Sequence, residues 1–167
     1  VLLSRALNPR YRAVVATYCR YLSLDLVDVA VADDGRTDLA DLVAKLDDST
    51  AAVVTGYPNY FGVIEDVAAL AEKSHQHGAK LVTAVAEPIA LGLLKSPGEL
   101  GADIVAGDAQ SFGLPLAFGG PYVGFFAVRQ KDVRGMPGRL VGETTDLEGQ
   151  RGFVLTLATR EQHIRRE

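Results

Sequence analysis

Short apolar runs alternate with amphipathic helical stretches along the first two thirds of this chain. The apolar runs lie at residues 1–4, 24–31, 50–55, 80–85 and 102–106. Between them, apolar residues recur at the i, i+3, i+4, i+7 spacing of a helix, as in Leu39, Leu42, Val43 and Leu46. Strands that alternate with helices predict an α/β fold with three layers, a mostly parallel sheet between two layers of helices.

The expected helices carry recognisable boundary residues. Asn8 before Pro9 is typical of a helix N-cap followed by the first helical residue, and Thr37 is the expected N-cap of a second helix. A third helix is expected over 66–77, where Gly78 suits the left-handed position after its end. The residues after Val128 follow no firm pattern, although 153–157 could form a last short strand or a packing strip.

A long loop with no charge after Asp108 connects an apolar run at 104–106 to a second one at 122–128. It is rich in Gly and Pro, and Gln110-Ser111 follows the first run. An aromatic loop, Tyr57 to Gly62, likewise follows the run at 50–55. Parallel strands place such loops at one sheet edge, where ligands bind in open α/β sheets. The candidate pocket or interface residues at this stage are Tyr57, Asn59, Tyr60, Gln110, Ser111 and Arg160.

Arg160 joins the candidates because several arginines crowd the last third of the chain. Arginine binds carboxylate and phosphate groups well, but surface ion pairs are the alternative explanation. Ser111 follows a strand, yet the sequence places no His or Asp to activate it, so a nucleophilic role has little support.

Composition and motifs exclude several classes of function. A net charge of −4 argues against nucleic acid as a partner, and no apolar run approaches the roughly 18 residues of a membrane span. The single cysteine, Cys19, allows no internal disulfide and is expected to pack in the core. His75 and His77 lie two apart on a helix and face different directions, so no metal site is expected. The sequence contains no P-loop, GxGxxG or GxSxG motif.

The two ends suggest a segment of a longer protein. The chain begins without Met inside an apolar run and stops in the polar stretch TREQHIRRE. We therefore expect residues 1–158 to form an α/β domain and residues 159–167 to begin a helix that leads into further chain.

Four stretches together resemble the glycine cleavage system P-protein family, specifically its subunit 1, or α, branch. They are PNYFGVIED at 58–66, PGELGADIVAGDAQSFGLPLAFGGPYVGFFA at 97–127, MPGRLVGETTDLEGQRGFVLTL at 136–157 and TREQHIRRE at 159–167. The resemblance implies the large domain of a fold-type I transferase dependent on pyridoxal phosphate (PLP), with a seven-stranded, mostly parallel sheet.

The resemblance also implies that the cofactor lysine is missing. The PLP-bearing sister subunit carries H-K-T-F-x-x-P-x-G-G-G-G-P, in which Lys forms the Schiff base. This chain reads Ala109-Gln110-Ser111-Phe112 and keeps the later Pro and Gly-Gly-Pro in register. Gln110 therefore occupies the Lys position, and an amide cannot form a Schiff base. No other lysine lies between Lys95 and Lys131.

A second cofactor anchor is also absent in this alignment. Fold-type I enzymes place an Asp against the pyridine nitrogen, and Ala84 occupies that position here. The resemblance thus implies no catalytic residue and no cofactor on this chain, with PLP on the partner subunit.

The implied function is support of PLP-dependent glycine decarboxylation on the partner, subunit 2 or β, and of aminomethyl transfer to the lipoyl H-protein. The parent assembly would be an α2β2 heterotetramer in the cytoplasm, or mitochondrial if the two halves are fused in a eukaryotic form. A standalone PLP-dependent transferase that uses an unaligned lysine, and a scaffold module without a role in the active site, remain as alternatives. The sequence leaves open whether the parent is a separate subunit or half of a fused chain.

Overall fold

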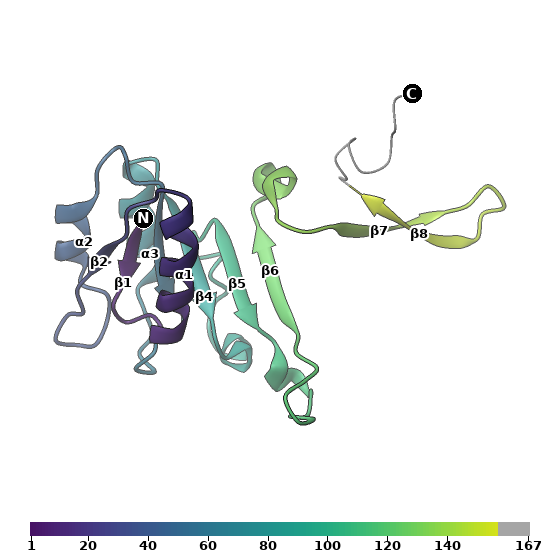
Figure 1. Ribbon diagram of the computed structural model, residues 1–167, viewed down its shortest axis with the longest axis horizontal. Coiled ribbons are helices and arrows are strands. Elements are labelled where there is room, and N and C mark those ends of the chain that lie inside the picture. The colour runs from purple at the N-terminus through teal and green to yellow at the C-terminus, as the bar shows by residue number, and fades with distance from the viewer. Residues whose placement is uncertain (157–167) are drawn as a thin grey trace. The chain divides into compact units, whose positions relative to one another are not determined.

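Six strands form one sheet in the first unit of the chain, which comprises Val1–Val128. The computed structural model describes residues 1–156 (Figure 1). The strands lie in the order β2-β1-β3-β4-β5-β6. They are β1 (Leu2–Ser4), β2 (Val27–Val29), β3 (Ala52–Gly56), β4 (Lys80–Val85), β5 (Ile104–Asp108) and β6 (Gly124–Val128). All neighbours are parallel except β5 and β6, so the predicted mostly parallel sheet is confirmed.

Two helices begin where the sequence predicts. Helix α1 (Pro9–Tyr21) has Asn8 as its N-cap, and the Asn8 side chain accepts a hydrogen bond from the Arg10 N–H. Helix α3 (Val67–Gln76) has Asp66 as its N-cap, and Gly78 follows its end at φ +72°. The left-handed conformation costs glycine little free energy because glycine has no Cβ. Gly78 therefore allows the chain to leave the helix at this point.

Helix α2 (Leu39–Lys45) corrects one prediction, because its N-cap is Asp38 and not Thr37. The Asp38 carboxylate accepts hydrogen bonds from the N–H groups of Ala40 and Asp41. The Thr37 hydroxyl points elsewhere, to the buried carboxylate of Glu65 at 2.9 Å. Asp and Thr both cap helices well. Because the Thr37 hydroxyl is bonded to Glu65, Asp38 is the residue that caps α2.

Strand β2 is shorter than the predicted 24–31 because its last residues leave the ladder. The Ala30 N–H donates to the Asp41 side chain at 2.7 Å, and the Ala30 carbonyl accepts from the Asp38 N–H. The predicted short helix near 89–94 is a 3₁₀ helix, η1 (Pro88–Gly92).

The two faces of the sheet are covered unequally. Val53, Leu81 and Val85 are 0% exposed and belong to one core cluster with Leu42 of α2 and Leu70 of α3. Because side chains alternate along a strand, Val54 and Val82 lie on the opposite face, toward α1. The unit therefore has the predicted three layers, α/β/α.

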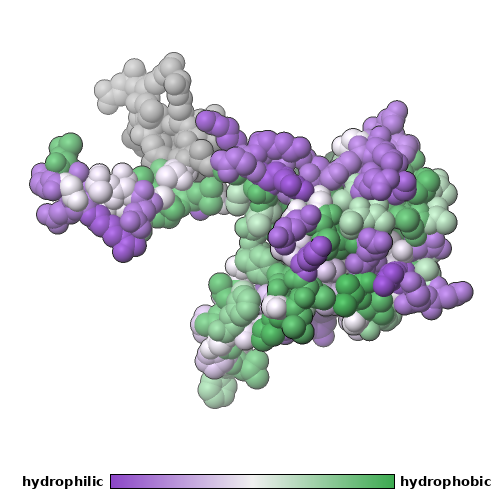
Figure 2. Space-filling model, turned by 180° about the vertical axis from the view of Figure 1, so that it is seen from behind, coloured by the Kyte–Doolittle hydropathy of each residue, from purple (hydrophilic) through white to green (hydrophobic). Residues whose placement is uncertain are grey.

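Much of the apolar stripe of α1 is left uncovered. Val14, Tyr18 and Leu22 are 54%, 70% and 66% exposed, and only Cys19 of the helix is buried. Further large apolar side chains are exposed on the loop that joins β5 and β6 (Figure 2). They are Phe112, Leu116, Phe118 and Tyr122. Exposure on this scale is typical of surfaces that contact other parts of a protein.

The second unit begins at Arg129 and contains a hairpin. A 3₁₀ helix, η3 (Gln130–Gly135), precedes strands β7 (Leu140–Thr145) and β8 (Arg151–Thr156), which pair antiparallel. Arg151 and Glu143 form an ion pair of 3.0 Å across the hairpin. The stretch at 153–157 is thus part of a strand as far as Thr156. The domain range 1–158 stays a prediction, and the helix expected at 159–167 lies outside the described residues.

Asp103 joins helix α3 to the start of β5. Its side chain is 7% exposed, with Oδ2 lying 2.7 Å from Nε2 of His75 and accepting from the Leu81 N–H at 2.9 Å. Burial raises the pKa of Asp103, but the hydrogen bonds from His75 and from the Leu81 N–H outweigh it, so the pKa is lowered. The ionised carboxylate therefore stabilises the folded chain.

Asp103→Asn should cost stability at neutral pH and progressively less in acid. The folded pKa lies below the unfolded value of about 3.9, so the contribution is complete above that value and is lost as pH falls through the folded pKa. Urea unfolding of the wild type and the variant at several pH values between about 7 and 2 measures the gap. Asp33→Asn, at an exposed turn position, is the matched control. A gap for Asp103→Asn that stays constant over this range would contradict the assignment.

Candidate functional site

The carboxyl ends of three parallel strands lie side by side and carry most of the predicted site residues. Strands β3, β4 and β5 end at Gly56, Val85 and Asp108, and their registers run in one direction. The Tyr57 loop and the Gln110 loop therefore leave the sheet at the same edge, as the sequence predicts. At that edge the described candidates occupy different settings.

Tyr57 is a core residue. It is 3% exposed, belongs to the main hydrophobic cluster, and its N–H donates to the Ala84 carbonyl at 2.9 Å. Burial raises the pKa of the Tyr57 phenol. Its side chain anchors the loop from beneath.

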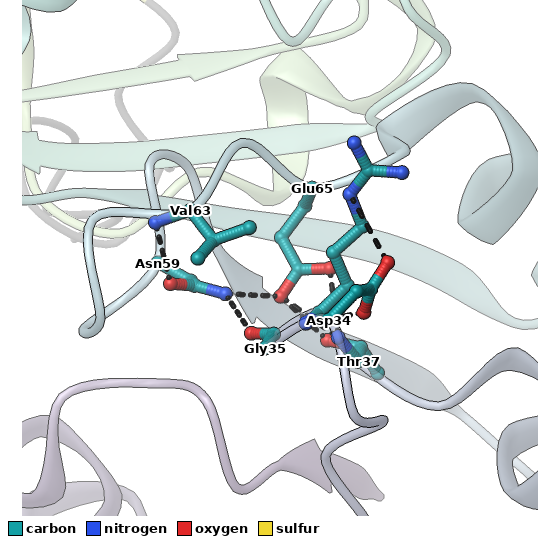
Figure 3. Close-up of polar contacts among 7 residues, drawn as sticks. Asp34, Gly35, Thr37, Asn59, Val63 and Glu65 are labelled. Carbon is teal, nitrogen blue, oxygen red and sulfur yellow. Dashed lines mark hydrogen bonds and ion pairs between the residues drawn. The ribbon is translucent and has the colours of Figure 1, made fainter.

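The hydrogen bonds of Asn59 are all made with groups inside the protein. Its Nδ2 donates to the Gly35 carbonyl and to Oε1 of Glu65, at 2.8 and 2.9 Å (Figure 3). Its Oδ1 accepts from the N–H groups of Phe61 and Val63, and its own N–H donates to the Val63 carbonyl. At 6% exposed, Asn59 is the centre of a turn and leaves no donor for a ligand.

Tyr60 forms part of the wall of a small cavity of about 140 Å³. Tyr11, Asn59 and Ala84 also line this cavity. The Tyr60 N–H donates to the Ala6 carbonyl at 2.8 Å, and its ring meets the Phe61 ring edge-on at 5.8 Å between centroids. Tyr60 is 57% exposed, so it can contact both the cavity and the surroundings.

Ala84 also lines a second and larger cavity, of about 510 Å³. Its walls are mainly apolar and come from α1, from the α1-facing side of the sheet and from the start of β6; they include Tyr11, Val54, Val82, Ala106 and Tyr122. Asp108 is the one ionisable group besides tyrosine among the lining residues. Where the resemblance implies a carboxylate for a pyridine nitrogen, this cavity has the methyl group of Ala84.

Gln110 fastens the loop that follows β5. Its Nε2 donates to the carbonyls of Leu114 and Pro115, at 3.0 and 3.2 Å, and its backbone N–H donates to Asp108 at 2.7 Å. Its Oε1 is buried and has no hydrogen-bond partner among the described residues. The amide thus holds the first turn of the loop closed.

Ser111 faces a different part of the edge. Its hydroxyl donates to Oε1 of Glu87 at 2.7 Å, and that carboxylate also accepts from the Ile89 N–H. The adjacent Phe112 lines a separate apolar cavity of about 590 Å³ with Pro88, Ile89 and Phe125. Within residues 1–156 the Ser111 hydroxyl pairs with Glu87 and with no histidine, so it makes a surface contact in this arrangement. Arg160 lies outside the described residues.

The close approach of β5 to its neighbours requires glycine at one position. A Cβ on Gly107 would lie 2.4 Å from the Phe125 ring and 2.5 Å from the Val85 carbonyl oxygen. No side chain fits such a space, so Gly107 lets β4, β5 and the Phe125 ring meet at the edge.

The residues at the two expected anchor positions do not fit PLP. A Schiff base needs a free amine, whereas the Gln110 amide nitrogen is committed to two carbonyls. A pyridinium nitrogen needs a carboxylate, whereas Ala84 offers a methyl group to apolar cavities. Within residues 1–156, no cluster of three His, Cys, Asp or Glu side chains could hold a metal ion. None of the helices in this described range is long and apolar enough to cross a membrane.

Glu65 is the functional candidate that reasoning from the sequence missed. It is 4% exposed and accepts hydrogen bonds from Thr37 and Asn59 (Figure 3). The available signal was a carboxylate close to an otherwise uncharged loop, in the stretch 58–66. Nothing local in the sequence marks that carboxylate as buried.

Comparisons with known proteins agree on one family. The family model described as "Glycine cleavage system P-protein" matches residues 1–167. "Probable glycine dehydrogenase (decarboxylating) subunit 1" of Desulforamulus reducens is 54% identical over 167 residues, which is all of this chain and 37% of the relative. The protein of the same name from Erythrobacter litoralis is 55% identical over 166 residues, 99% of this chain and 37% of the relative.

A crystal structure of glycine decarboxylase (P-protein) of the glycine cleavage system, in inhibitor-bound form, has a similar fold. It matches with a TM-score of 0.84 and 45% identity, over 93% of this chain and 34% of that chain. The chain thus spans somewhat more than a third of the length of the proteins that it matches.

Gln110→Glu should loosen the loop after β5. The change replaces the amide donor by an oxygen that faces two carbonyls, so hydrogen bonds that each contribute about 0.5–1.5 kcal/mol are lost. We expect chymotrypsin to cut at Phe112 and Phe118 at least about fivefold faster, because cleavage follows local opening. Gln130→Glu, at an exposed position, is the control. Equal cleavage of both variants and the wild type would show that the Gln110 amide does not fasten the loop.

Proposed function

The chain belongs to the glycine cleavage system P-protein family, and from that premise we propose that it supports glycine decarboxylation on a partner subunit. The site that decarboxylates glycine and binds PLP lies on subunit 2 in this proposal. The aminomethyl group then passes to the lipoyl H-protein. The chain spans only 37% of the length of a relative that is 54% identical, so we assign this activity to the whole assembly and not to this chain alone.

One observation supports this proposal more than any other. At the edge of the sheet where a ligand is expected, Gln110 and Ala84 occupy the two positions that the cofactor chemistry depends on, and neither can supply it. The surrounding loops are nevertheless held by specific hydrogen bonds, from the Gln110 contacts to the Asn59 turn. This edge of the sheet has a fixed shape but no residue that could hold the cofactor. Such an edge suits a subunit that helps to form the site of its partner.

The exposed apolar loop between β5 and β6 suits such an assembly. Leu116 and Phe118 are 82% and 111% exposed, and no charged residue occurs from Ala109 to Val128. Burying a side chain of this size contributes about 1.5–3 kcal/mol, so a partner surface gains by covering them. We propose an α2β2 assembly with subunit 2, located in the cytoplasm, or in mitochondria if the halves are fused.

The alternative of a standalone PLP-dependent transferase requires an amine elsewhere. Its test is an absorption spectrum with added PLP followed by borohydride reduction. A reducible adduct on this chain would contradict our proposal that PLP binds to the partner subunit. The scaffold alternative predicts that glycine-dependent CO₂ exchange by the partner proceeds equally well with Gln110→Glu and with the wild type.

Gln110→Lys alone should not restore PLP binding. The new amine meets a pocket in which Ala84 still leaves the pyridine nitrogen without a carboxylate, so only one of the fixing contacts is present. Gln110→Lys combined with Ala84→Asp should give weak adduct formation at best. Titration of PLP into the wild type and both variants, followed by absorbance of the reduced adduct, measures the difference.

A matched control comes from placing the same amine elsewhere on the exposed loop, as Leu116→Lys. Gln110→Lys should bind PLP no better than this control. Tight binding by Gln110→Lys alone would mean that a complete pocket survives and that a single residue removed its chemistry.

A further inference from the structure

The Glu65 carboxylate connects the turn that carries Thr37 to the turn that carries Asn59. Its Oε1 accepts from Oγ1 of Thr37 and from Nδ2 of Asn59, both at 2.9 Å. The Thr37 N–H lies 2.9 Å from Oε2 and 3.1 Å from Oε1. Figure 3 shows Glu65 between the turn that carries Gly35 and Thr37 and the turn that carries Asn59 and Val63. All of its partners are donors, as a carboxylate requires.

In the part of the chain that the structure describes, donors and not an ion pair hold the buried Glu65 carboxylate. Within residues 1–156, no Lys, Arg or His side chain forms an ion pair with Glu65, and Arg36 pairs with Asp34 instead. A buried carboxylate is costly unless its oxygens are hydrogen-bonded, so Glu65 depends on the donors around it. The same dependence fixes the positions of those donors.

The contacts extend to the ends of two strands. Thr37 has one hydroxyl proton, which goes to Glu65, so the hydroxyl of Ser4 must be the donor in the 2.7 Å contact between Ser4 and Thr37. The Thr55 hydroxyl lies 3.3 Å from the same Thr37 oxygen. Ser4 ends β1 and Thr55 is near the end of β3, so the contacts reach the carboxyl edge of the sheet.

Asn59 transmits the position of Glu65 to the aromatic loop. With its Nδ2 held by Glu65 and Gly35, the Oδ1 of Asn59 faces the N–H groups of Phe61 and Val63. Tyr60 lies between these contacts, in the wall of the cavity that Ala84 also lines. A rotation of the Asn59 amide would remove its hydrogen bonds with Phe61 and Val63 and loosen the turn that carries Tyr60.

We propose that Glu65 is a positioning residue, a buried carboxylate that latches Asn59 and thereby holds Tyr60 in the cavity wall at the carboxyl edge of the sheet. The latch is a property of this chain alone. It goes beyond the proposed function and does not depend on a partner or a cofactor.

Glu65→Gln is the sharpest change because it keeps the shape and removes one acceptor. If the new NH₂ replaces Oε1, it faces donors on Thr37 and Asn59. If it replaces Oε2, it faces the Thr37 N–H that lies 2.9 Å from that oxygen. In the first orientation Thr37 and Asn59 lose their acceptor. In the second the Thr37 N–H keeps Oε1 at 3.1 Å, but the new NH₂ is itself a buried donor that faces another donor, so either orientation brings the expensive kind of hydrogen-bond loss.

The test is amide hydrogen exchange, read by NMR, in the longest natural protein that contains this chain. In Glu65→Gln we expect the amides of Phe61 and Val63 to exchange roughly tenfold faster, because a buried unpaired donor favours local opening. The amide of Leu81 in β4 should keep its rate. Glu72→Gln removes the same charge from an exposed position on α3, where the Glu72 side chain is 64% exposed, and should change neither rate.

A second pair of variants tests positioning against simple loss of stability. Asn59→Asp alone puts two carboxylates in contact and should accelerate exchange in the loop. Adding Glu65→Gln restores a donor opposite the new carboxylate, so the double variant should be better protected than Asn59→Asp. Loop exchange within twofold of wild type in Glu65→Gln would overturn the proposal. So would equal acceleration of Phe61 and Leu81, or a double variant no better protected than Asn59→Asp.

Discussion

Parallel pairing of β3, β4 and β5 is the constraint on which the rest of the structure depends. The register of Thr55 with Thr83, and of Thr83 with Val105, brings three carboxyl ends to one edge. The loops that start at Tyr57 and Ala109 meet there although about fifty residues separate them in the sequence. Helices α2 and α3 fix the sheet from one face through the buried cluster around Leu42, Leu70 and Leu81.

The polar side chains at this edge are mostly bonded to the protein itself. Asn59 holds its own turn and Glu65, Gln110 holds the carbonyls of Leu114 and Pro115, and Ser111 holds Glu87. Ala84 adds only a methyl group to the cavities between them. Hydrogen bonds of this kind each contribute about 0.5–1.5 kcal/mol to stability and give the edge a fixed shape. In our account the fixed shape is what this subunit contributes to the assembly.

The sequence predicts the parts of this fold that local chemistry decides. Asn8 with Pro9, and Asp66 with Gly78, mark helices α1 and α3, and the apolar runs at 50–55 and 80–85 mark β3 and β4. Prediction from the sequence fails where a residue distant in the chain determines the local structure. Thr37 suits an N-cap, but its hydroxyl is taken by Glu65, from 28 residues further along the chain. Asn59 and Gln110 read as candidate ligand contacts because no local pattern shows that their donors are already used.

The central claim is that the cofactor of the assembled enzyme is held by the partner and not by this chain. The most direct measurement is borohydride reduction of the complete assembly in the presence of PLP and without glycine. Peptide mass spectrometry then locates the pyridoxyl group. Our account predicts one modified lysine, on subunit 2, and none on this chain, including Lys95 and Lys131, the lysines on either side of Gln110 in the sequence. A stoichiometric pyridoxyl group on any lysine of this chain would contradict it.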